Sequence, residues 1–186
     1  IKGFRDFMKA GVQCYGCDKL QEKLEIVYGE KIIGLPAKRS VRISQWTVTP
    51  FCLPHDDTPN FGYLIDFPGD AGRLLYATDF EYLPYTFKSL KINYFLLECN
   101  HQADLVDRSE AKYEHSIRGH SELSTVCELL RVNKTPDMRN VILCHLSDGW
   151  SDPGQMKREV QEVVGKWVRV EVAEKGFQCE LSKYPF

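Results

Sequence analysis

The sequence has no apolar run that approaches the roughly 18 residues of a membrane-spanning helix, so it predicts a protein without a membrane partner. It also lacks an excess of positive charge, because 24 Lys and Arg residues against 26 Asp and Glu residues give a formal net charge of −2. A general basic coat for nucleic acid is therefore excluded, although a local basic groove is not. Low-complexity tracts and repeats are absent too, and 12% of the residues are aromatic, which excludes disordered and collagen-like chains.

A second Cys-x-x-Cys pair is also missing beside the one formed by Cys14 and Cys17. A zinc ribbon needs two such pairs, so this one predicts a structural role. The total of seven cysteines is odd, and most of them lie within apolar stretches. This usage is typical of buried, reduced thiols, and it predicts a cytoplasmic protein rather than a disulfide framework.

The length of 186 residues, 43% of them apolar, predicts one domain over residues 1–186 with a core of its own. The first half of the sequence favours strands joined in hairpins, and the second half favours strands that alternate with helices. This order predicts an α/β sandwich with helices on the outside. We expect strands at 12–15, 39–53, 61–67, 73–78, 91–98 and 141–146, and a closing hairpin formed by 168–172 and 177–181. We expect helices at 3–10, from Asp18, at 102–115, at 121–132 and from Pro153, with Ser121 as the cap of the helix at 121–132.

Three of the predicted strands are followed at once by a side chain that can bind a metal ion. These side chains are His55 after 51–54, Asp79 after 74–78, and His145 after 141–144. Functional side chains are common where a strand passes into a loop. Two imidazoles and one carboxylate brought together make a ligand set for zinc or a similar metal. For each residue taken alone, an ordinary turn residue is the alternative interpretation.

Longer motifs surround these positions. They are Pro54-His55-Asp56-Asp57 followed by Phe61-Gly62-Tyr63-Leu64-Ile65, Tyr76-Ala77-Thr78-Asp79, Leu97-Glu98-Cys99-Asn100-His101, Arg118-Gly119-His120-Ser121 and Leu143-Cys144-His145-Leu146-Ser147. In this order the motifs resemble those of metallo-β-lactamase-fold hydrolases. The last three are similar to the WalJ (YycJ) branch, whose members are regarded as DNA-processing exonucleases or phosphodiesterases. The resemblance extends over residues 1–176 and implies an αββα sandwich.

The resemblance also implies ligands for two metal ions. His55 matches a ligand of the first metal, and His145 matches a ligand of the second. Asp79 matches the carboxylate that bridges both ions, and is therefore a catalytic candidate as well.

Four further residues from these motifs are candidates for other roles at the site. His101 and His120 match positions where a side chain would contact a phosphate or give a proton to a leaving group, so we predict them to be catalytic. Arg118 and Ser147 come from the same motifs and are the candidate substrate-binding residues.

One motif of the family, HxHxDH, is missing from the sequence. In relatives this motif supplies most of the remaining ligands of the two metals. The opening stretch Ile1-Lys2-Gly3-Phe4 looks like the segment just after it, and the first residue is not Met. We therefore expect an N-terminally truncated copy that binds two divalent ions, zinc or manganese, if the motif lies upstream. A degenerate protein that never had the motif is the alternative, in which three ligands would hold one zinc ion.

The resemblance implies a metal-dependent hydrolase, most specifically a phosphodiesterase or exonuclease that acts on nucleic acid such as single-stranded DNA. Arg108, Lys112 and Arg118 could line a groove for such a strand with Tyr113 stacking on a base, although the net charge favours an ordinary solvated face. A hydrolase of a small cyclic phosphodiester, a lactone or a thioester is the alternative enzyme, because a fold alone does not choose between acyl and phosphoryl chemistry. A catalytically inactive binding module is the alternative outside the enzymes.

Overall fold

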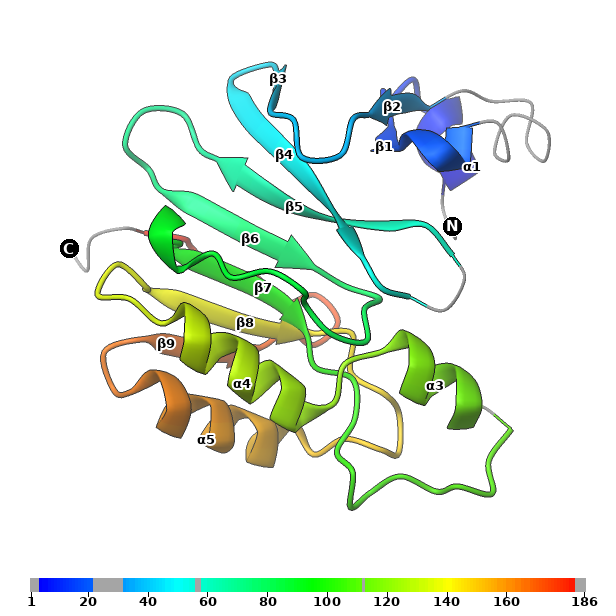
Figure 1. Cartoon of the computed structure of the whole chain (residues 1–186), viewed down its shortest axis with the longest axis vertical. Helices are drawn as coiled ribbons and strands as arrows, with labels where there is room; N and C mark the ends of the chain where they lie inside the picture. The colour runs from blue at the N-terminus through cyan, green and yellow to red at the C-terminus, as the bar shows by residue number, and fades with distance from the viewer. Residues whose placement is uncertain (1–3, 22–31, 56–57, 112, 183–186) are drawn as a thin grey trace.

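The computed structural model describes residues 4–21, 32–55, 58–111 and 113–182. Its centre is a sheet of seven strands that lie in the same order in space as along the chain (Figure 1). The strands are β3 Val41–Ile43, β4 Trp46–Leu53, β5 Asn60–Asp66, β6 Arg73–Ala77, β7 Tyr94–Glu98, β8 Asn140–Cys144 and β9 Arg169–Val172.

The sheet changes from antiparallel to parallel pairing at β6. The strands β3 to β6 are antiparallel neighbours, whereas β6, β7, β8 and β9 run parallel to one another. This confirms the expected succession of hairpins and then alternating strands and helices. Because parallel strands point the same way, β6, β7 and β8 end at one shared edge of the sheet. The residues that follow these three strands are thereby brought together.

Two helices cover one face of this sheet. They are α4 Leu123–Asn133 and α5 Pro153–Val164, which lie side by side in front of the parallel strands (Figure 1). Helix α5 begins as the sequence predicts, with Pro153 in its first turn. The side chain of Asp152 caps this helix by accepting a hydrogen bond of 2.9 Å from the Gln155 N–H.

The core lies between these helices and the sheet. Val126 and Leu130 of α4 and Met156 and Val160 of α5 are fully buried. They belong to one cluster with a row of sheet residues that the strand register aligns on the same face: Leu75, Phe95, Val141 and Val170. Burial of each such side chain contributes roughly 1.5–3 kcal/mol, so this cluster fixes the sheet against the helices.

The remaining elements are short. Helix α1 Phe4–Lys9 precedes a parallel pair of strands, β1 Tyr15–Cys17 and β2 Ile33–Leu35. A 3₁₀ turn, η1, spans Lys88–Leu90, and helix α3 spans Tyr113–Gly119. None of the helices in the described part of the chain is long and apolar enough to cross a membrane. All seven cysteines are free thiols.

The helix expected at 102–115 is wrong, because most of this segment forms turns and α3 begins only at Tyr113. The reason is that tertiary hydrogen bonds take the place of helical ones. The Gln102 N–H donates to the Trp150 carbonyl at 2.9 Å, and the Trp150 indole donates to Glu110 at 2.8 Å. These bonds fix the segment to the loop that follows β8.

Two smaller expectations also differ from the structure. Helix α4 is capped by Glu122, whose carboxylate accepts a hydrogen bond of 2.8 Å from the Ser124 N–H, whereas Ser121 donates its hydroxyl to the Phe80 carbonyl. The expected strand at 177–181 is absent from the described residues, although the turn before it forms with a Phe177 N–H to Glu174 carbonyl bond of 2.9 Å. The chain past β9 therefore does not close a hairpin.

Candidate metal centre

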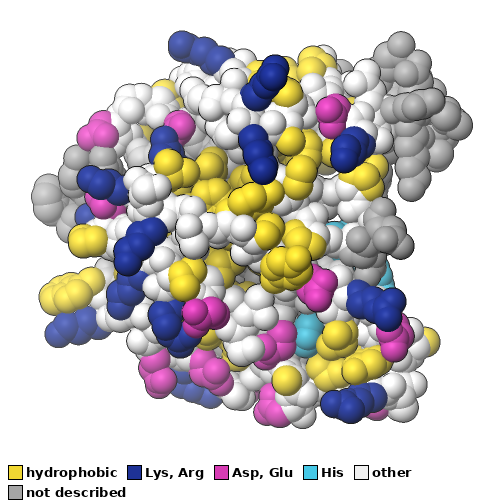
Figure 2. Space-filling view, in the orientation of Figure 1, with side chains coloured by type: hydrophobic (Ala, Val, Ile, Leu, Met, Phe, Trp, Pro, Cys, Tyr) yellow, Lys and Arg dark blue, Asp and Glu magenta, His cyan; other side chains and the backbone are white. Residues whose placement is uncertain are grey.

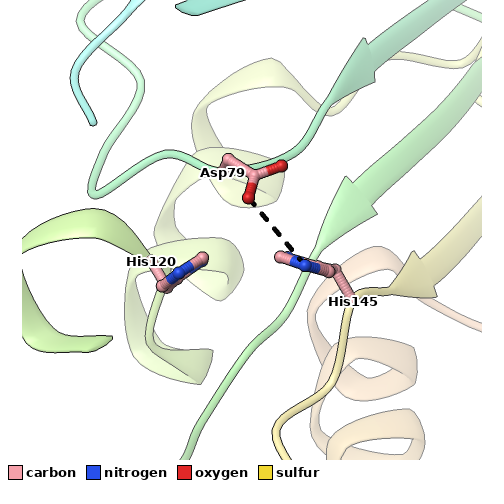
Figure 3. A group of neighbouring side chains, drawn as sticks. All are labelled: Asp79, His120 and His145. Atoms are coloured by element: carbon pink, nitrogen blue, oxygen red, sulfur yellow. Dashed lines mark ion pairs between the residues drawn. The ribbon is translucent and has the colours of Figure 1, made fainter. Parts of the chain in front are cut away.

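Three side chains that can bind a metal meet at the shared edge of the parallel strands. Asp79 follows β6, His145 follows β8, and His120 lies between α3 and α4. Each offers one ligand atom, and these atoms all lie within 4.8 Å of one another. Figure 3 shows the three side chains converging, with His145 Nε2 3.9 Å from Asp79 Oδ1. We call these three residues the strand-edge cluster.

An unusual backbone conformation turns two members of the cluster out of the sheet. Asp79 and His145 both have φ of 55°, in the left-handed region. Asp and His adopt this region more readily than most residues, and β-branched residues almost never do. The conformation still costs on the order of 1–3 kcal/mol per residue, so the surrounding structure has to hold it.

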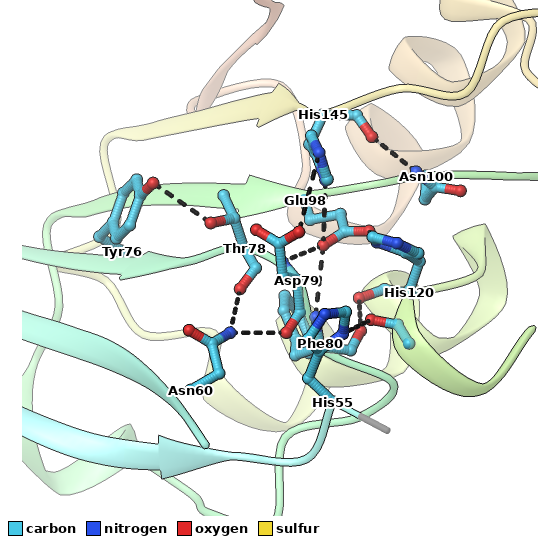
Figure 4. Close-up of polar contacts among 12 residues, drawn as sticks. His55, Asn60, Tyr76, Thr78, Asp79, Phe80, Glu98, Asn100, His120 and His145 are labelled. Atoms are coloured by element: carbon cyan, nitrogen blue, oxygen red, sulfur yellow. Dashed lines mark hydrogen bonds and ion pairs between the residues drawn. The ribbon is translucent and has the colours of Figure 1, made fainter. Parts of the chain in front are cut away.

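Two asparagine side chains hold these left-handed turns. Asn60 donates from its amide nitrogen to the carbonyls of Thr78 and Asp79, at 2.8 and 2.7 Å. Asn100 donates in the same way to the carbonyl of His145, at 2.9 Å (Figure 4). The backbone carbonyl groups of these turns, which lie past the ends of the strands, thereby accept hydrogen bonds from side chains.

The buried carboxylate of Glu98 contacts all three members of the strand-edge cluster. Glu98 is the last residue of β7 and has no solvent exposure. It accepts hydrogen bonds from the Asp79 and Phe80 N–H groups and from His120 Nδ1, the last at 2.6 Å. The oxygen that accepts from the two backbone N–H groups, Oε2, also lies 3.5 Å from His145 Nδ1, whereas His120 Nδ1 bonds to the other oxygen, Oε1 (Figure 4). Because both imidazoles present Nδ1 to Glu98, their Nε2 atoms are the ones left to bind a metal ion.

The ionisation of these groups follows from the same contacts. Burial by itself would raise the pKa of Glu98, but the hydrogen bonds and charges of His120 and His145 outweigh it, and the net pKa is lowered. The hydrogen bond to Glu98 raises the pKa of His145; burial opposes this, and the charges of Glu98 and Asp79 add to it. Glu98 is therefore an anion at neutral pH, and His145 is more basic than a free imidazole.

His55 lies beside the strand-edge cluster and not within it. Its ring centre is 5.3 Å from that of His120, while the His120 and His145 ring centres are 5.2 Å apart. Its Nδ1 donates to the Gly119 carbonyl at 2.7 Å, so its Nε2 is the free nitrogen. The neighbouring acidic residues of its motif, 56 and 57, lie outside the described residues, as do residues 1–3 and 112.

The other predicted site residues, His101, Arg118 and Ser147, contact residues outside the strand-edge cluster. His101 is 2% exposed, forms a bridge with Glu122, and has a pKa that burial lowers. Arg118 is 73% exposed and lies 3.6 Å from Glu114, in an exposed pair of little energetic weight. Ser147 donates its backbone N–H to the Asn100 carbonyl at 2.8 Å. The structure thus brings together two of the three predicted ligands, Asp79 and His145, and adds His120.

The sequence interpretation missed the residues that support the cluster. Glu98 and Asn100 lie within the motif at 97–101, in which only His101 was predicted to have a role, and Asn60 lies outside every motif. A signal for Glu98 was present, since a carboxylate that ends an apolar strand is rarely buried without donors around it. Asn60 carries no comparable signal, because its role depends on the pairing of β5 with β6.

The ion pair of Glu98 with His145 should contribute most to the stability of the metal-free protein between pH 4.5 and 6.5, the ordinary pKa values of a glutamate and a histidine. Glu98 has a lowered pKa in the fold, so its contribution is present above 4.5 and is lost as the pH falls through the folded value. His145 has a raised pKa, so its contribution is present below 6.5 and is lost as the pH rises through the folded value. Urea unfolding with a chelator, below, within and above this window, measures the profile. The difference in stability between the wild type and His145→Gln should therefore shrink above pH 6.5, and a difference that grows above that pH would contradict the pairing. His101, whose lowered pKa favours folding above 6.5, contributes to both proteins and cancels in this difference.

Removal of the Asn60 amide should weaken the turn that carries Asp79. The variant Asn60→Ala loses two hydrogen bonds to carbonyls, which should lower the free energy of unfolding by about 1–3 kcal/mol. A matched control is Ser40→Ala, which removes one exposed bond to Thr49 and should cost less than about 1 kcal/mol. Denaturant unfolding of both variants tests this, and equal losses would show that the Asn60 bonds have no special role.

Comparison by sequence finds no match to this chain among protein-family models or curated proteins. Comparison of structures finds many similar proteins, among them the following three. One is YhfI from Bacillus subtilis, a metallo-β-lactamase-fold protein, with a TM-score of 0.66, 18% identity, and coverage of 93% of this chain and 67% of that one. A diphosphatase of the PhnP family has a TM-score of 0.61 and 15% identity over 92% of this chain and 60% of that one. CmlA, a diiron β-hydroxylase from Streptomyces venezuelae, has a TM-score of 0.57 and 12% identity over 87% of this chain and 38% of that one.

These comparisons concern the fold and not the activity. At 12–18% identity they show a shared arrangement of strands and helices, and the chain spans between 38% and 67% of the length of these proteins. The sequence motifs and the structural matches agree on that arrangement. The chain has the metallo-β-lactamase fold.

Proposed function

We propose that this chain carries a metal centre of a hydrolase that cleaves phosphodiester bonds, with nucleic acid as its substrate class. The observation that carries the proposal is the strand-edge cluster, in which two imidazoles and a carboxylate converge above the buried Glu98 carboxylate. The motif likeness to the WalJ-like branch gives the substrate class. The diphosphatase among the similar structures is consistent with phosphoryl chemistry on this fold.

The donor set suits a divalent cation of the zinc or manganese kind. Imidazole nitrogen and carboxylate oxygen are ligands of both metals, and His145 and Asp79 supply one of each. The hydrogen bonds of Glu98 to both Nδ1 atoms are the kind of support that orients metal-binding histidines. Asp79 and His145 are 42% and 46% exposed in their side chains, so a substrate has access to them.

A second ion would be bound on the side of His55. In the motif likeness His55 and His145 serve different ions, with the Asp79 carboxylate between them. The ring of His120 has centre-to-centre distances of 5.3 Å to His55 and 5.2 Å to His145, so His120 lies close to both of the other imidazoles. A divalent cation bound there would act as a Lewis acid on the phosphoryl oxygens and would lower the pKa of a water molecule toward neutrality.

We assign His120 to proton transfer. Its Nδ1 is 2.6 Å from the Glu98 carboxylate, and its side chain is only 10% exposed. A buried carboxylate in this position fixes the orientation of the ring, and an oriented imidazole is the arrangement of a histidine that gives a proton to a leaving group. His145 is farther from Glu98, at 3.5 Å, and its Nε2 faces Asp79. It is therefore the better metal ligand of the two.

Glu98 should control metal affinity without touching the metal. The variant Glu98→Gln replaces one acceptor oxygen with an amide that donates, so it cannot serve all the N–H groups that now meet there. We expect the affinity for zinc or manganese to fall about 10- to 100-fold. Competition with a chromophoric chelator measures this, and Asp79→Asn and His145→Gln should lose the metal more completely. An affinity in Glu98→Gln equal to the wild-type value would contradict the proposed support.

The role of His120 can be separated from that of the ligands. The variant His120→Gln should keep its metal and lose about 10²- to 10⁴-fold in the hydrolysis of a phosphodiester, the usual contribution of general acid catalysis. Elemental analysis and hydrolysis of single-stranded DNA by the same preparation give both values. A variant that loses its metal places His120 among the ligands. Turnover of lactones without turnover of DNA would reject the proposed substrate class.

A further inference from the structure

A pocket of about 270 Å³ adjoins the strand-edge cluster and shares only His120 with it. It lies between the loop after β7, helix α3 and the beginning of α4. In Figure 2 this part of the surface, around α3, shows hydrophobic side chains beside acidic, basic and histidine side chains. The charged, polar, aromatic and aliphatic side chains of its wall include Glu81, His101, Arg108, Tyr113, Ile117 and Glu122.

The wall of this pocket contains a buried imidazole that lacks a hydrogen-bond partner. His101 is 2% exposed, and its Nδ1 has no hydrogen-bond partner among the residues that the structure describes. A buried polar atom without a partner costs about 1–3 kcal/mol, so natural proteins rarely keep one away from a functional site. His101 also lines the pocket, so its ring forms part of the surface that an occupant meets.

The charged side chains that line the pocket favour a neutral occupant over a second phosphate. Among the described residues of the wall, the two carboxylates of Glu81 and Glu122 outnumber the one guanidinium of Arg108. An anionic group would be repelled there. A neutral group that donates hydrogen bonds from N–H or NH₂ finds acceptors in these carboxylates. The Arg108 side chain and the His101 ring can meet its carbonyl or ring nitrogen atoms.

The rest of the wall suits a flat ring. Tyr113 supplies an aromatic face, and Val106 and Ile117 supply aliphatic surface. The volume is near the lower end of the roughly 300–1,000 Å³ of ordinary ligand pockets, so it accommodates one ring system and not a long chain. A nucleobase combines two flat apolar faces with an edge of mixed donors and acceptors.

We propose that this pocket holds the base of a nucleotide whose phosphate lies at the strand-edge cluster. The proposal rests on the phosphodiesterase function above and gives it a specificity element, the base next to the cleaved bond. The distance between phosphate and base is bridged by the sugar, and His120, the residue shared by the pocket and the cluster, lies at this junction. Bases with an exocyclic amino group should bind best, because the carboxylates of the wall accept from that group.

The test compares ligands that differ only in the base. The four nucleoside 5′-monophosphates and ribose 5-phosphate are titrated into the full chain, with and without zinc, by isothermal calorimetry. Cytidine, adenosine and guanosine monophosphates should bind about 5- to 150-fold more tightly than ribose 5-phosphate, the range expected for stacking one base on an aromatic ring. Equal affinities for nucleotides and ribose 5-phosphate would overturn the proposal.

Two variants locate the effect in the pocket. Ile117→Trp fills the pocket from the half-exposed surface of α3, and Tyr113→Ala removes the stacking face. Both should abolish the preference for nucleotides over ribose 5-phosphate. The matched control is Leu105→Trp, which adds the same ring at an exposed position of the neighbouring loop and should keep the preference. A preference that survives both pocket variants would refute the assignment, and circular dichroism shows that each variant is folded.

The same proteins separate this proposal from the function on which it rests. Metal-dependent cleavage of DNA by a chain that shows no base preference in binding would reject the pocket and keep the phosphodiesterase. A base preference that Ile117→Trp abolishes, in a chain that cleaves no phosphodiester, would keep the pocket and reject the phosphodiesterase.

Discussion

The candidate site depends on one buried carboxylate. Glu98 has no contact with solvent, and an ionised group in such a place loses hydration worth several kcal/mol, on the order of the whole stability of a small domain. The loss is offset only because donors from three separate segments meet the carboxylate. They are the backbone after β6, the imidazole that follows α3, and the imidazole that follows β8. The carboxylate therefore acts as the common anchor of three loops, to which bonds such as that from the Ser121 hydroxyl to the Phe80 carbonyl add further links.

This anchor explains why the parallel half of the sheet carries the chemistry. β7 lies between β6 and β8, so a residue at its carboxyl end is next to both neighbouring loops. Glu98 occupies that central position, and the two asparagines, Asn60 and Asn100, secure the outer turns. The core of α4 and α5 beneath the same strands supplies the rigidity on which such alignment depends, because packed apolar side chains shift little.

The sequence was sufficient for the fold and for part of the site. The features that were predicted correctly lie within short stretches of sequence, where local preferences decide the structure. They are the apolar strands, the beginning of α5 with its cap and proline, and the motifs around Asp79 and His145. The prediction was wrong where contacts with residues distant in the sequence decide the local structure. The segment after His101 has helical composition, but it forms turns because its backbone bonds to the loop after β8. His120 could be placed near the site by its motif, but its pairing with Glu98 depends on a strand 22 residues away in the chain.

The left-handed backbone at Asp79 and His145 also limits what these positions can become. A residue with φ near 55° must tolerate a conformation in which only glycine is free of strain and only Asn, Asp and His are common among the others. Three of these four residue types can donate a lone pair to a metal ion. A β-branched residue at either position would therefore strain the turn as well as remove the ligand, whereas Asn would keep both the backbone conformation and a ligand atom. The geometry of the turns thus restricts which replacements keep the coordinating character of this edge of the sheet.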